Sequence, residues 1–449
     1  MKILLIVTCI LFYGFQSAYS QTWKNYPYQS KKSSIVFPDD EGNHPWVPDL
    51  EWWYVVMHVK GDISGDQYSI LVTHFNNLFR FFTVTNVTKK THSSGTAMGI
   101  LKASTKRLDL TQNTKFGKDY MRTKKDGAGN LIPFEYELKT HHKDMNVMAS
   151  LRSTKAPLMV GGSGYVDVGS SGKSWYYSNT RLDVKGVLDY AGIKEGFSGI
   201  AWMDHQWGPF LISPVEGLRT FESYEWFCIQ LDDGSDIMIS NIFNRKYQRP
   251  KDGKHGGIEI YYPDGKWAKT EDVEFTRVKY WKDPDSGHVM SMGWKVVVPA
   301  WGLDINLTPD FEHQMVNFPL GGDFWEGSIH VTGKLKKVSV KGKAYGELVH
   351  RYKKPKIALT RLTKNLASDS LGVSWKVKNP DAGNPLNYDL FLYSGKKVIK
   401  KINGLKKNSY ILNSASTLLK SGQRFRVKIV GSSVDGLLKG HANSKKQRW

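Results

Sequence analysis

Most of this chain consists of short runs in which apolar and polar residues alternate, and the runs end at clusters of Gly, Asp, Asn or Pro. A period of two is the pattern of a β-strand that buries one of its faces, and no segment from Gln21 to Arg351 carries a convincing apolar period of 3.6 residues. The sequence therefore predicts an all-β body. A long series of hairpins closes most readily into barrels, because a closed barrel leaves no exposed sheet edge.

Turn sequences rich in Asp and Gly set the strand pairing. Gly tolerates the positive φ that such tight turns require, so runs on either side of these turns are expected to pair as hairpins. The predicted neighbours are Glu51–Val59 with Tyr68–Phe75, Glu225–Leu231 with Asp236–Ile242, Ile258–Tyr262 with Lys266–Thr270, and Gly293–Pro299 with Leu303–Leu307.

The N-terminus has the order of a secretory signal peptide. Lys2 precedes an apolar run from Ile3 to Phe15, and Ala18-Tyr19-Ser20 supplies the small residues that signal peptidase reads. We expect residues 1–20 to be removed and the protein to be periplasmic or secreted. Cys228 is the one cysteine outside this segment, so no intramolecular disulfide is expected, and the thiol is interpreted as a small buried apolar group.

The charge of the chain is concentrated at its C-terminal end. Residues 351–449 hold 22 Lys and Arg residues against 4 Asp residues, whereas the rest of the chain has 41 basic and 38 acidic residues. Short strands around one inward Trp375 suggest a small sandwich of the immunoglobulin or fibronectin type III kind. We expect this basic module, residues 357–449, to dock on an anionic cell-envelope surface. Nucleic acid is not expected as a partner, because the module lacks interleaved exposed aromatic residues.

Aromatic residues cluster along the body of the chain. Because neighbouring strand residues face opposite sides of a sheet, Trp53 is expected on one face and Trp52 with Tyr54 on the other. Such clusters either fill a barrel interior or line a cavity for an apolar ligand. The residues predicted to line a ligand cleft are Trp52, Tyr54, Tyr177, Trp202, Trp207, Trp226 and Trp325.

The strongest chemical candidate is the adjacent pair Asp204 and His205, which lies within the Gly-rich and aromatic segment from Gly192 to Gly217. The two side chains have different ordinary pKa values, and aromatic walls would desolvate both, so they are predicted to act as a catalytic acid and base. The alternative is structural: Asp204 caps a turn and His205 bonds a carbonyl group. No spacing of His residues predicts a metal site, and no cofactor is expected.

At these residues the chain resembles a known family. Six motifs occur in the order found in AttH-type proteins, which include the carotenoid hydratases and are often labelled predicted secreted hydrolases. The motifs are Glu51-Trp52-Trp53-Tyr54, Tyr176-Tyr177-Ser178, the Ala201–Gly208 stretch, Trp226-Phe227 with Gln230–Gly234, Trp325-Glu326-Gly327 and Ala344–Leu348. In the hydratase branch a Tyr-x-Asp element follows a His-x-Trp element; only its Asp is kept here, as Asp204, so His205 would replace the missing His.

The resemblance implies two tandem lipocalin-like β-barrels, followed here by the immunoglobulin-like β-sandwich. The expected division is a signal peptide over residues 1–20, a first lipocalin-like domain over 21–198, a second over 199–355, and the basic module over 356–449. The expected function is the binding of a large apolar, isoprenoid or lipid-like ligand in an aromatic cleft. If the protein is an enzyme, the expected reaction is hydration or hydrolysis of that ligand by acid and base catalysis. A carrier of apolar cargo without catalysis and an envelope adhesion protein stay open as alternatives.

Overall fold

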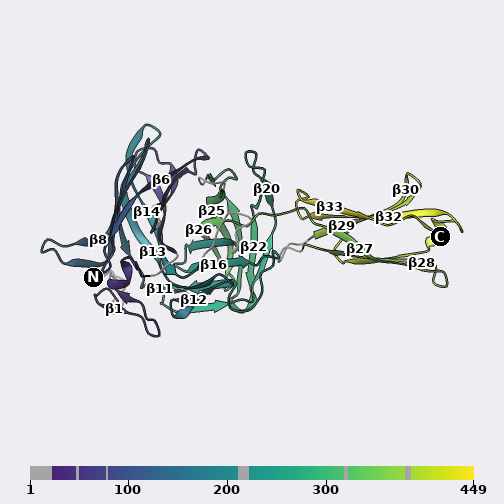
Figure 1. Cartoon of the computed structure of the whole chain (residues 1–449), viewed down its shortest axis with the longest axis horizontal. Helices are drawn as coiled ribbons and strands as arrows, with labels where there is room; N and C mark the ends of the chain where they lie inside the picture. Colours follow the sequence, from purple (N-terminus) through teal and green to yellow (C-terminus); the bar gives the residue numbers. More distant parts are fainter. Residues whose placement is uncertain (1–22, 47–49, 77–78, 211–221, 318–321, 380–385) are drawn as a thin grey trace, which may run out of the picture.

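The computed structural model describes residues 23–46, 50–76, 79–210, 222–317, 322–379 and 386–449 (Figure 1). Strands are the main regular element of the described residues, and the helical elements among them are four 3-10 turns of three residues each. Within the described part, no helix has the length and apolar character needed to cross a membrane. The predicted signal peptide, residues 1–20, lies outside the described residues.

Ten strands form a closed barrel in the first half of the chain. In chain order they are β3 (Leu50–Gly61), β4 (Gln67–Phe75), β5 (Phe79–Asn86), β6 (Thr91–Ala103), β7 (Asp109–Thr114), β8 (Gly117–Lys125), β9 (Leu131–His142), β10 (Met145–Ser153), β13 (Gly172–Tyr190) and β14 (Ile193–Gly208). Strands β3 to β10 form a meander, β14 pairs with β3, and β13 pairs with both β14 and β10. The β10–β13 pairing closes the ring. The interior is filled by aromatic and aliphatic side chains, so the barrel encloses a packed core.

Small elements cover one end and one flank of this barrel. They are β1 (Tyr28–Gln29), β2 (Val36–Phe37), η1 (Asp39–Glu41), β11 (Leu158–Met159), η2 (Val160–Gly162) and β12 (Tyr165–Val168). Phe37 of β2 packs on Phe134 of β9, with the two rings tilted by 59° and their centroids 5.2 Å apart. Strands β11 and β12 both pair with β13.

A second curved sheet packs against the barrel. Its strands are β15 (Ser223–Leu231), β16 (Asp236–Phe243), β17 (Gly256–Tyr261), β18 (Trp267–Thr270), β19 (Glu274–Arg277), β22 (Trp294–Val298), β23 (Leu303–Pro309), β24 (Met315–Val316), β25 (Phe324–Leu335) and β26 (Val338–Leu348). The order runs β18-β17-β16-β15-β26-β25-β23-β22-β19, and within the described residues no ladder joins β18 to β19. The second unit is therefore an open half-barrel. One of its faces encloses a core of its own, and the other packs on the first barrel.

The last part of the chain forms two facing sheets. The strands are β27 (Ile357–Asn365), β28 (Ser370–Val377), β29 (Leu386–Ser394), β30 (Lys397–Leu405), β31 (Ser409–Asn413), β32 (Arg424–Ser433), β33 (Lys439–Asn443) and β34 (Gln447–Arg448). β27, β28 and β31 form one sheet; β30, β29, β32, β33 and β34 form the other. Both sheets bury side chains around Trp375. Figure 1 shows this module extending away from the barrels, and Tyr280, Tyr352 and Leu438 form the small cluster at its base.

A short hairpin and a 3-10 turn complete the second unit. β20 (Tyr280–Lys282) pairs with β21 (Val289–Ser291), and η3 (Pro299–Trp301) connects β22 to β23. η4 (Ala415–Thr417) lies in the C-terminal module. The backbone N–H of Tyr280 donates to Asp435 at 2.7 Å, which ties this hairpin to the module.

The all-β prediction and the predicted strand pairs are confirmed, but one predicted boundary is displaced. The division between residues 198 and 199 falls inside β14, whose residues from Phe197 to Gly208 pair with β3 of the first barrel. The Gly-rich segment that suggested a junction is therefore a long barrel strand up to Gly208. The residues between it and β15, 211–221, lie outside the described residues.

Candidate functional site

A cavity of about 100 Å³ lies between the first barrel and the half-barrel. The barrel contributes Trp52 and Tyr54 from β3, Tyr176 from β13, and Asp204 with Gln206 from β14. The half-barrel contributes Tyr224 and Trp226 from β15, Ser240 from β16, and Glu347 from β26. Two packed sheets therefore supply an aromatic lining with carboxyl groups in it.

Strand register explains why these side chains meet. On the barrel, Asp204 stands directly opposite Tyr54 on β3 and opposite Ser178 on β13. On the half-barrel, Glu347 stands opposite Trp226 on β15 and opposite Glu326 on β25. Side chains paired in this way share one face of their sheet. Each sheet thus presents a row of polar and aromatic groups to the other.

Asp204 is held by two donors from its own barrel. The indole Nε1 of Trp202 donates to Oδ1 at 2.6 Å, and the hydroxyl of Tyr176 donates to Oδ2 at 2.7 Å. Burial raises the pKa of Asp204 to about 6, although the hydrogen bonds from Tyr176 and Trp202 favour the ionised form. This carboxyl group therefore titrates close to neutrality.

Two glutamates of the half-barrel complete a carboxyl trio with Asp204. The hydroxyl of Tyr224 donates to Glu347, and the hydroxyl of Tyr54 crosses the interface to donate to Oε2 of Glu326 at 3.0 Å. Burial raises the pKa of Glu347 to about 7, and the charge of Asp204 adds to this effect. Burial and the charge of Glu347 raise the pKa of Glu326 well above its ordinary range. Three buried carboxyl groups at close range do not all ionise, so the site holds protons at neutral pH.

A glycine makes the Trp325-Glu326-Gly327 motif possible. A Cβ atom at position 327 would lie 2.3 Å from the ring of Trp325, so only glycine lets this indole fold over its own strand. Trp325 then fills the half-barrel core, while Glu326 faces the barrel.

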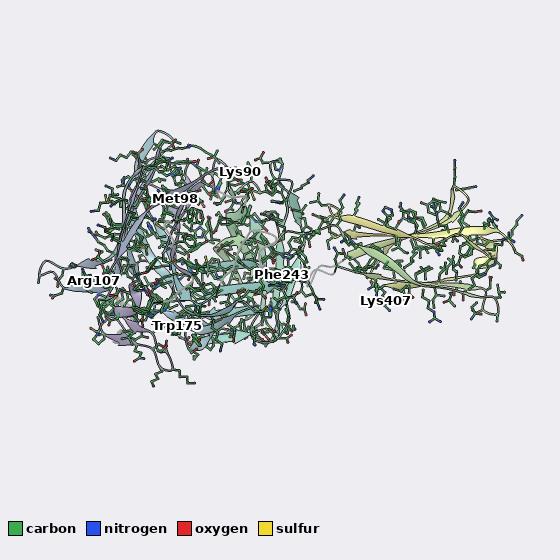
Figure 2. The ribbon with its side chains drawn as sticks, in the orientation of Figure 1. Lys90, Met98, Arg107, Trp175, Phe243 and Lys407 are labelled. Carbon is green, nitrogen blue, oxygen red and sulfur yellow. The ribbon has the colours of Figure 1, made fainter. Side chains whose placement is uncertain are left out.

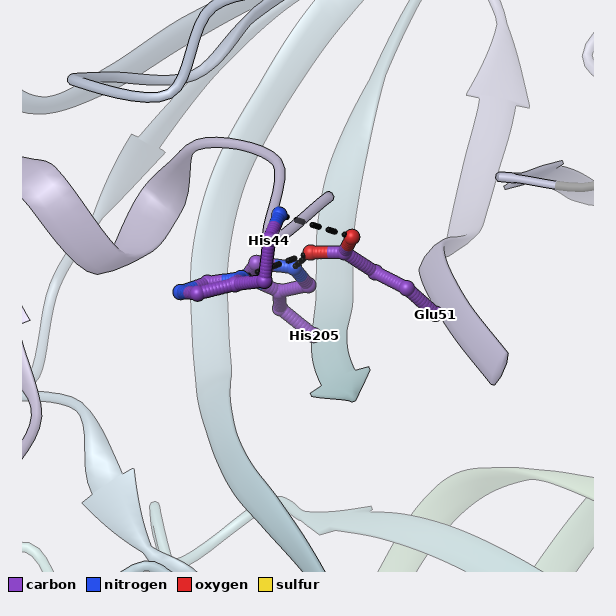
Figure 3. A group of neighbouring side chains, drawn as sticks. All are labelled: His44, Glu51 and His205. Atoms are coloured by element: carbon purple, nitrogen blue, oxygen red, sulfur yellow. Dashed lines mark hydrogen bonds and ion pairs between the residues drawn. The ribbon is translucent and has the colours of Figure 1, made fainter. Parts of the chain in front are cut away.

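His205 points to the opposite side of β14, into the first barrel. Its Nε2 lies 2.9 Å from Oε1 of Glu51, and Nδ1 of His44 lies 2.8 Å from the same oxygen (Figure 3). Nε2 of His44 bonds Asp40 at 3.1 Å. Its ring stacks on Trp207 with centroids 4.0 Å apart. The four polar side chains form a network inside the barrel, on the face of the strand away from Asp204.

The charges in this network follow from burial and pairing. Burial would lower the pKa of His44, but the carboxylates of Asp40 and Glu51 outweigh it and raise that pKa. Burial lowers the pKa of His205. Glu51 has a lowered pKa because hydrogen bonds from His205 and His44 outweigh its burial. The two carboxylates therefore favour the protonated form of His44, and burial favours the neutral form of His205.

Two groups of described residues could hold a metal ion by proximity. In the barrel, the ligand atoms of His44, Glu51 and His205 lie within 4.8 Å of one another. The second group, Asp283 with Asp285 and His313, is mainly exposed. The Glu51 contacts have ordinary hydrogen-bond lengths, so the barrel network is satisfied at Glu51 without an ion.

The structure brings together part of the predicted site. Asp204, Trp52, Tyr54 and Trp226 line the cavity, and Trp202 lies behind Asp204 as its hydrogen-bond donor. The predicted pairing of Asp204 with His205 is wrong in its geometry, because adjacent residues of a regular strand face opposite sides. For the same reason Tyr177 and Trp207 lie in the barrel core, and Trp325 lies in the half-barrel core.

Sequence reasoning missed four members of the site: Tyr176, Tyr224, Glu326 and Glu347. Each lies in or beside one of the recognised aromatic motifs. A period-two count from Trp226 would have placed Tyr224 on the same face. The two glutamates carried a further signal, because an acidic residue within an apolar strand is uncommon unless it is exposed or functional.

A filled closed barrel packed on an open half-barrel, with a carboxyl-bearing cavity between them, defines an all-β protein of the lipocalin-like two-domain class. The profile of the AttH-like family matches residues 28–351. The chain belongs to the AttH-like family.

Solved structures share this fold. A putative AttH from Nitrosomonas europaea has a TM-score of 0.57 and 17% sequence identity, and the match covers 73% of this chain and 99% of that one. Kievitone hydratase from Nectria haematococca has a TM-score of 0.56 and 17% identity, over 73% of this chain and 98% of that one. No curated protein sequence matches the chain. At this identity the likeness concerns the fold, which spans both barrel units.

Proposed function

We propose that this protein is a cofactor-independent hydratase that adds water to an alkene group of an apolar, isoprenoid or lipid-like ligand. The observation that carries the proposal is the pair of buried carboxyl groups, Asp204 and Glu347, that face one aromatic cavity from two different sheets. Their pKa values, about 6 and about 7, bracket the range in which one group is ionised while the other keeps its proton. Such a split is what general acid and base catalysis requires.

Glu347 is assigned the role of acid and Asp204 the role of base. Glu347 transfers its proton to one carbon of the double bond, which leaves a carbocation on the other carbon. Water attacks that carbon and gives a proton to Asp204 as the new C–O bond forms. Return of this proton to Glu347 restores the starting state, so the sum is alkene plus water giving alcohol.

Aromatic rings support the intermediate. Trp226 packs edge to face with Tyr54 at 5.5 Å between ring centroids, and both rings line the cavity with Trp52. The face of an aromatic ring attracts positive charge, by about 2 kcal/mol or more when water is excluded. The lining therefore favours a carbocation more than the neutral alkene.

This assignment changes the roles expected from the sequence. His205 is separated from the cavity by the strand that carries it, so Glu347 takes the second catalytic role. Asp204 becomes the base rather than the acid, because its pKa is the lower of the two.

The size of the cavity limits what enters it. A volume of about 100 Å³ is well below the ~300 Å³ at which drug-sized ligand sites begin. The cavity suits the reacting end of a ligand, with the remainder of a larger molecule outside. A carrier for large apolar cargo would need a wider site than this one, so at this cavity the enzyme is favoured over the carrier. The fold shared with kievitone hydratase, which its name describes as a hydratase, agrees with this choice.

The test is hydration of an alkene panel in water enriched in oxygen-18. The panel contains geraniol, linalool and squalene, and mass spectrometry detects the alcohol that carries the heavy oxygen. Asp204→Asn and Glu347→Gln should each lower turnover by about 100-fold or more while binding, followed by tryptophan fluorescence, is retained.

Glu41→Gln is the matched control. Glu41 is also fully buried, and its pKa is also raised to about 7, but it lies inside the barrel bonded to Tyr26 and Tyr136. Its replacement should leave turnover per folded molecule unchanged. Binding of the panel without any labelled product would contradict the hydratase and favour a carrier.

A further inference from the structure

In the described part of the basic C-terminal module, the Lys and Arg side chains have no acidic partner within ion-pair distance. Among described residues 354–449, no Lys or Arg side chain forms an ion pair. Most of these cations are exposed, as Figure 2 shows around Lys407. Uncompensated charge of one sign creates a field that attracts polyanions.

Part of this charge forms a stripe on one sheet face. Arg424, Arg426 and Lys428 occupy alternate positions of β32, and the residues between them, Phe425 and Val427, are buried in the module core. Alternation places the three cations on the outer face, at a spacing of roughly 6 to 7 Å along the strand. Arg448 of β34 stands opposite Arg424 of β32, so the positive charge extends sideways onto the neighbouring strand.

Two aromatic rings hold cations on the same face. Phe391 stands opposite Lys428 on β32 and opposite Lys401 on β30, and Lys401 Nζ lies 5.3 Å from the ring centroid. Tyr393 stands opposite Arg426, whose guanidinium lies 4.6 Å from that ring. Aromatic residues therefore interleave with the cations on this face, but both rings are half-buried rather than exposed. Cations already lie over them, and this contact orders the charged groups.

We infer that the outer face of β30, β29, β32 and β34 binds a linear acidic polysaccharide. Arg424, Arg426 and Lys428 run in a line along β32, which matches an extended chain of anionic groups better than the plane of a lipid surface. Arg424, Arg426 and Arg448 can each form paired hydrogen bonds with a carboxylate or sulfate. Single-stranded nucleic acid is disfavoured because it stacks bases on open aromatic faces, and these rings are half-buried with cations over them. This surface is independent of the chemistry proposed at the cavity.

The experiment measures binding of the full mature chain to immobilised polygalacturonate. Arg424, Arg426 and Lys428 are replaced together by Gln, which removes the charge of the stripe and keeps polar side chains at the three positions. Taking about fivefold for each cation near an anionic surface, the triple variant should bind about 100-fold more weakly at low salt. The wild-type protein should also release as salt rises, because the screening length falls to about 3 Å at 1 M.

A matched variant tests whether position matters. Arg361 of β27, Lys376 of β28 and Lys378, which directly follows β28, are exposed, and their replacement by Gln removes the same charge from the side of the other sheet. This variant should bind within about twofold of wild type, and thermal melts check that both variants fold.

Three results would overturn the inference. Equal losses in the two variants would show that net charge acts without a site. Equal or tighter binding to a poly-dT oligonucleotide would assign the face to nucleic acid. Equal binding to vesicles of phosphatidylcholine with phosphatidylglycerol would assign it to lipid.

Discussion

Replacing Glu347 by Gln should stabilise the protein above neutral pH while it removes activity. Glu347 is fully buried, and burial raises its pKa from 4.5 to about 7. In the unfolded chain this group ionises near its ordinary pKa, whereas in the folded protein it keeps its proton until about pH 7. Stability from this group is therefore complete below about pH 4.5, falls as pH rises between the two values, and stays reduced above pH 7.

The magnitude follows from the two pKa values. The interval from 4.5 to about 7 is about 2.5 pH units, and at 1.36 kcal/mol per unit it corresponds to about 3 kcal/mol. Gln carries no charge at any pH, so Glu347→Gln avoids this loss. The variant should gain up to about 3 kcal/mol in unfolding free energy at pH 8 and close to none at pH 4. Its amide can still accept the hydrogen bond from Tyr224.

The assay is urea denaturation followed by tryptophan fluorescence, at pH values from 4 to 8. Glu274→Gln serves as the control, because Glu274 is an exposed residue of β19 and its replacement should change stability equally little at every pH. A Glu347→Gln variant that loses stability at pH 8, or gains the same amount at pH 4, would refute the claim that this carboxyl group is held protonated by burial.

Three further predictions concern the barrel network, the half-barrel core and the N-terminus. His205→Ala should lower the unfolding free energy by about 3 kcal/mol or more, because it leaves Glu51 without one of its buried partners. Turnover per folded molecule should stay unchanged. A 100-fold loss of turnover at normal stability would instead show that His205 takes part in catalysis. Arg277→Met leaves Glu225 buried without its cation and should cost about 3 to 5 kcal/mol in urea denaturation, whereas an unchanged midpoint would show that Glu225 is neutral. N-terminal sequencing of exported protein should begin at or within a few residues of Gln21, and material that starts at Met1 would contradict the proposed signal peptide and the periplasmic or secreted location.

Strand pairing over short distances was predictable from the sequence, whereas ring closure was not. The turn at Asp232–Ser235 fixed the β15–β16 hairpin, and the alternation of Trp52, Trp53 and Tyr54 gave the correct faces. The β10–β13 pairing depends on curvature accumulated over many strands, and the open edge of the half-barrel depends on strands that do not meet. Neither property resides in a local pattern.

The sequence predicted the candidate site where a single residue stood out within a motif. It did not predict which face of a strand each residue of the site occupies. Asp204 was identified because it lies in a dense aromatic motif. His205 was paired with it because the two residues are adjacent in the sequence. Adjacent residues of a strand, however, point to opposite faces of the sheet. Glu326 and Glu347 become recognisable only when β25 and β26 are set side by side and their shared face is seen to meet the barrel. That meeting is a tertiary contact between motifs more than a hundred residues apart.

The most direct test of the central claim is the pH dependence of kcat/KM for whichever alkene of the panel is hydrated. An ionised Asp204 and a protonated Glu347 together predict a bell-shaped profile that falls below about pH 6 and above about pH 7. Asp204→Asn should remove the acidic limb from the residual activity, and Glu347→Gln should remove the alkaline limb. A profile that is flat from pH 5 to 8, or one that keeps both limbs in both variants, would contradict an acid and base pair at this cavity.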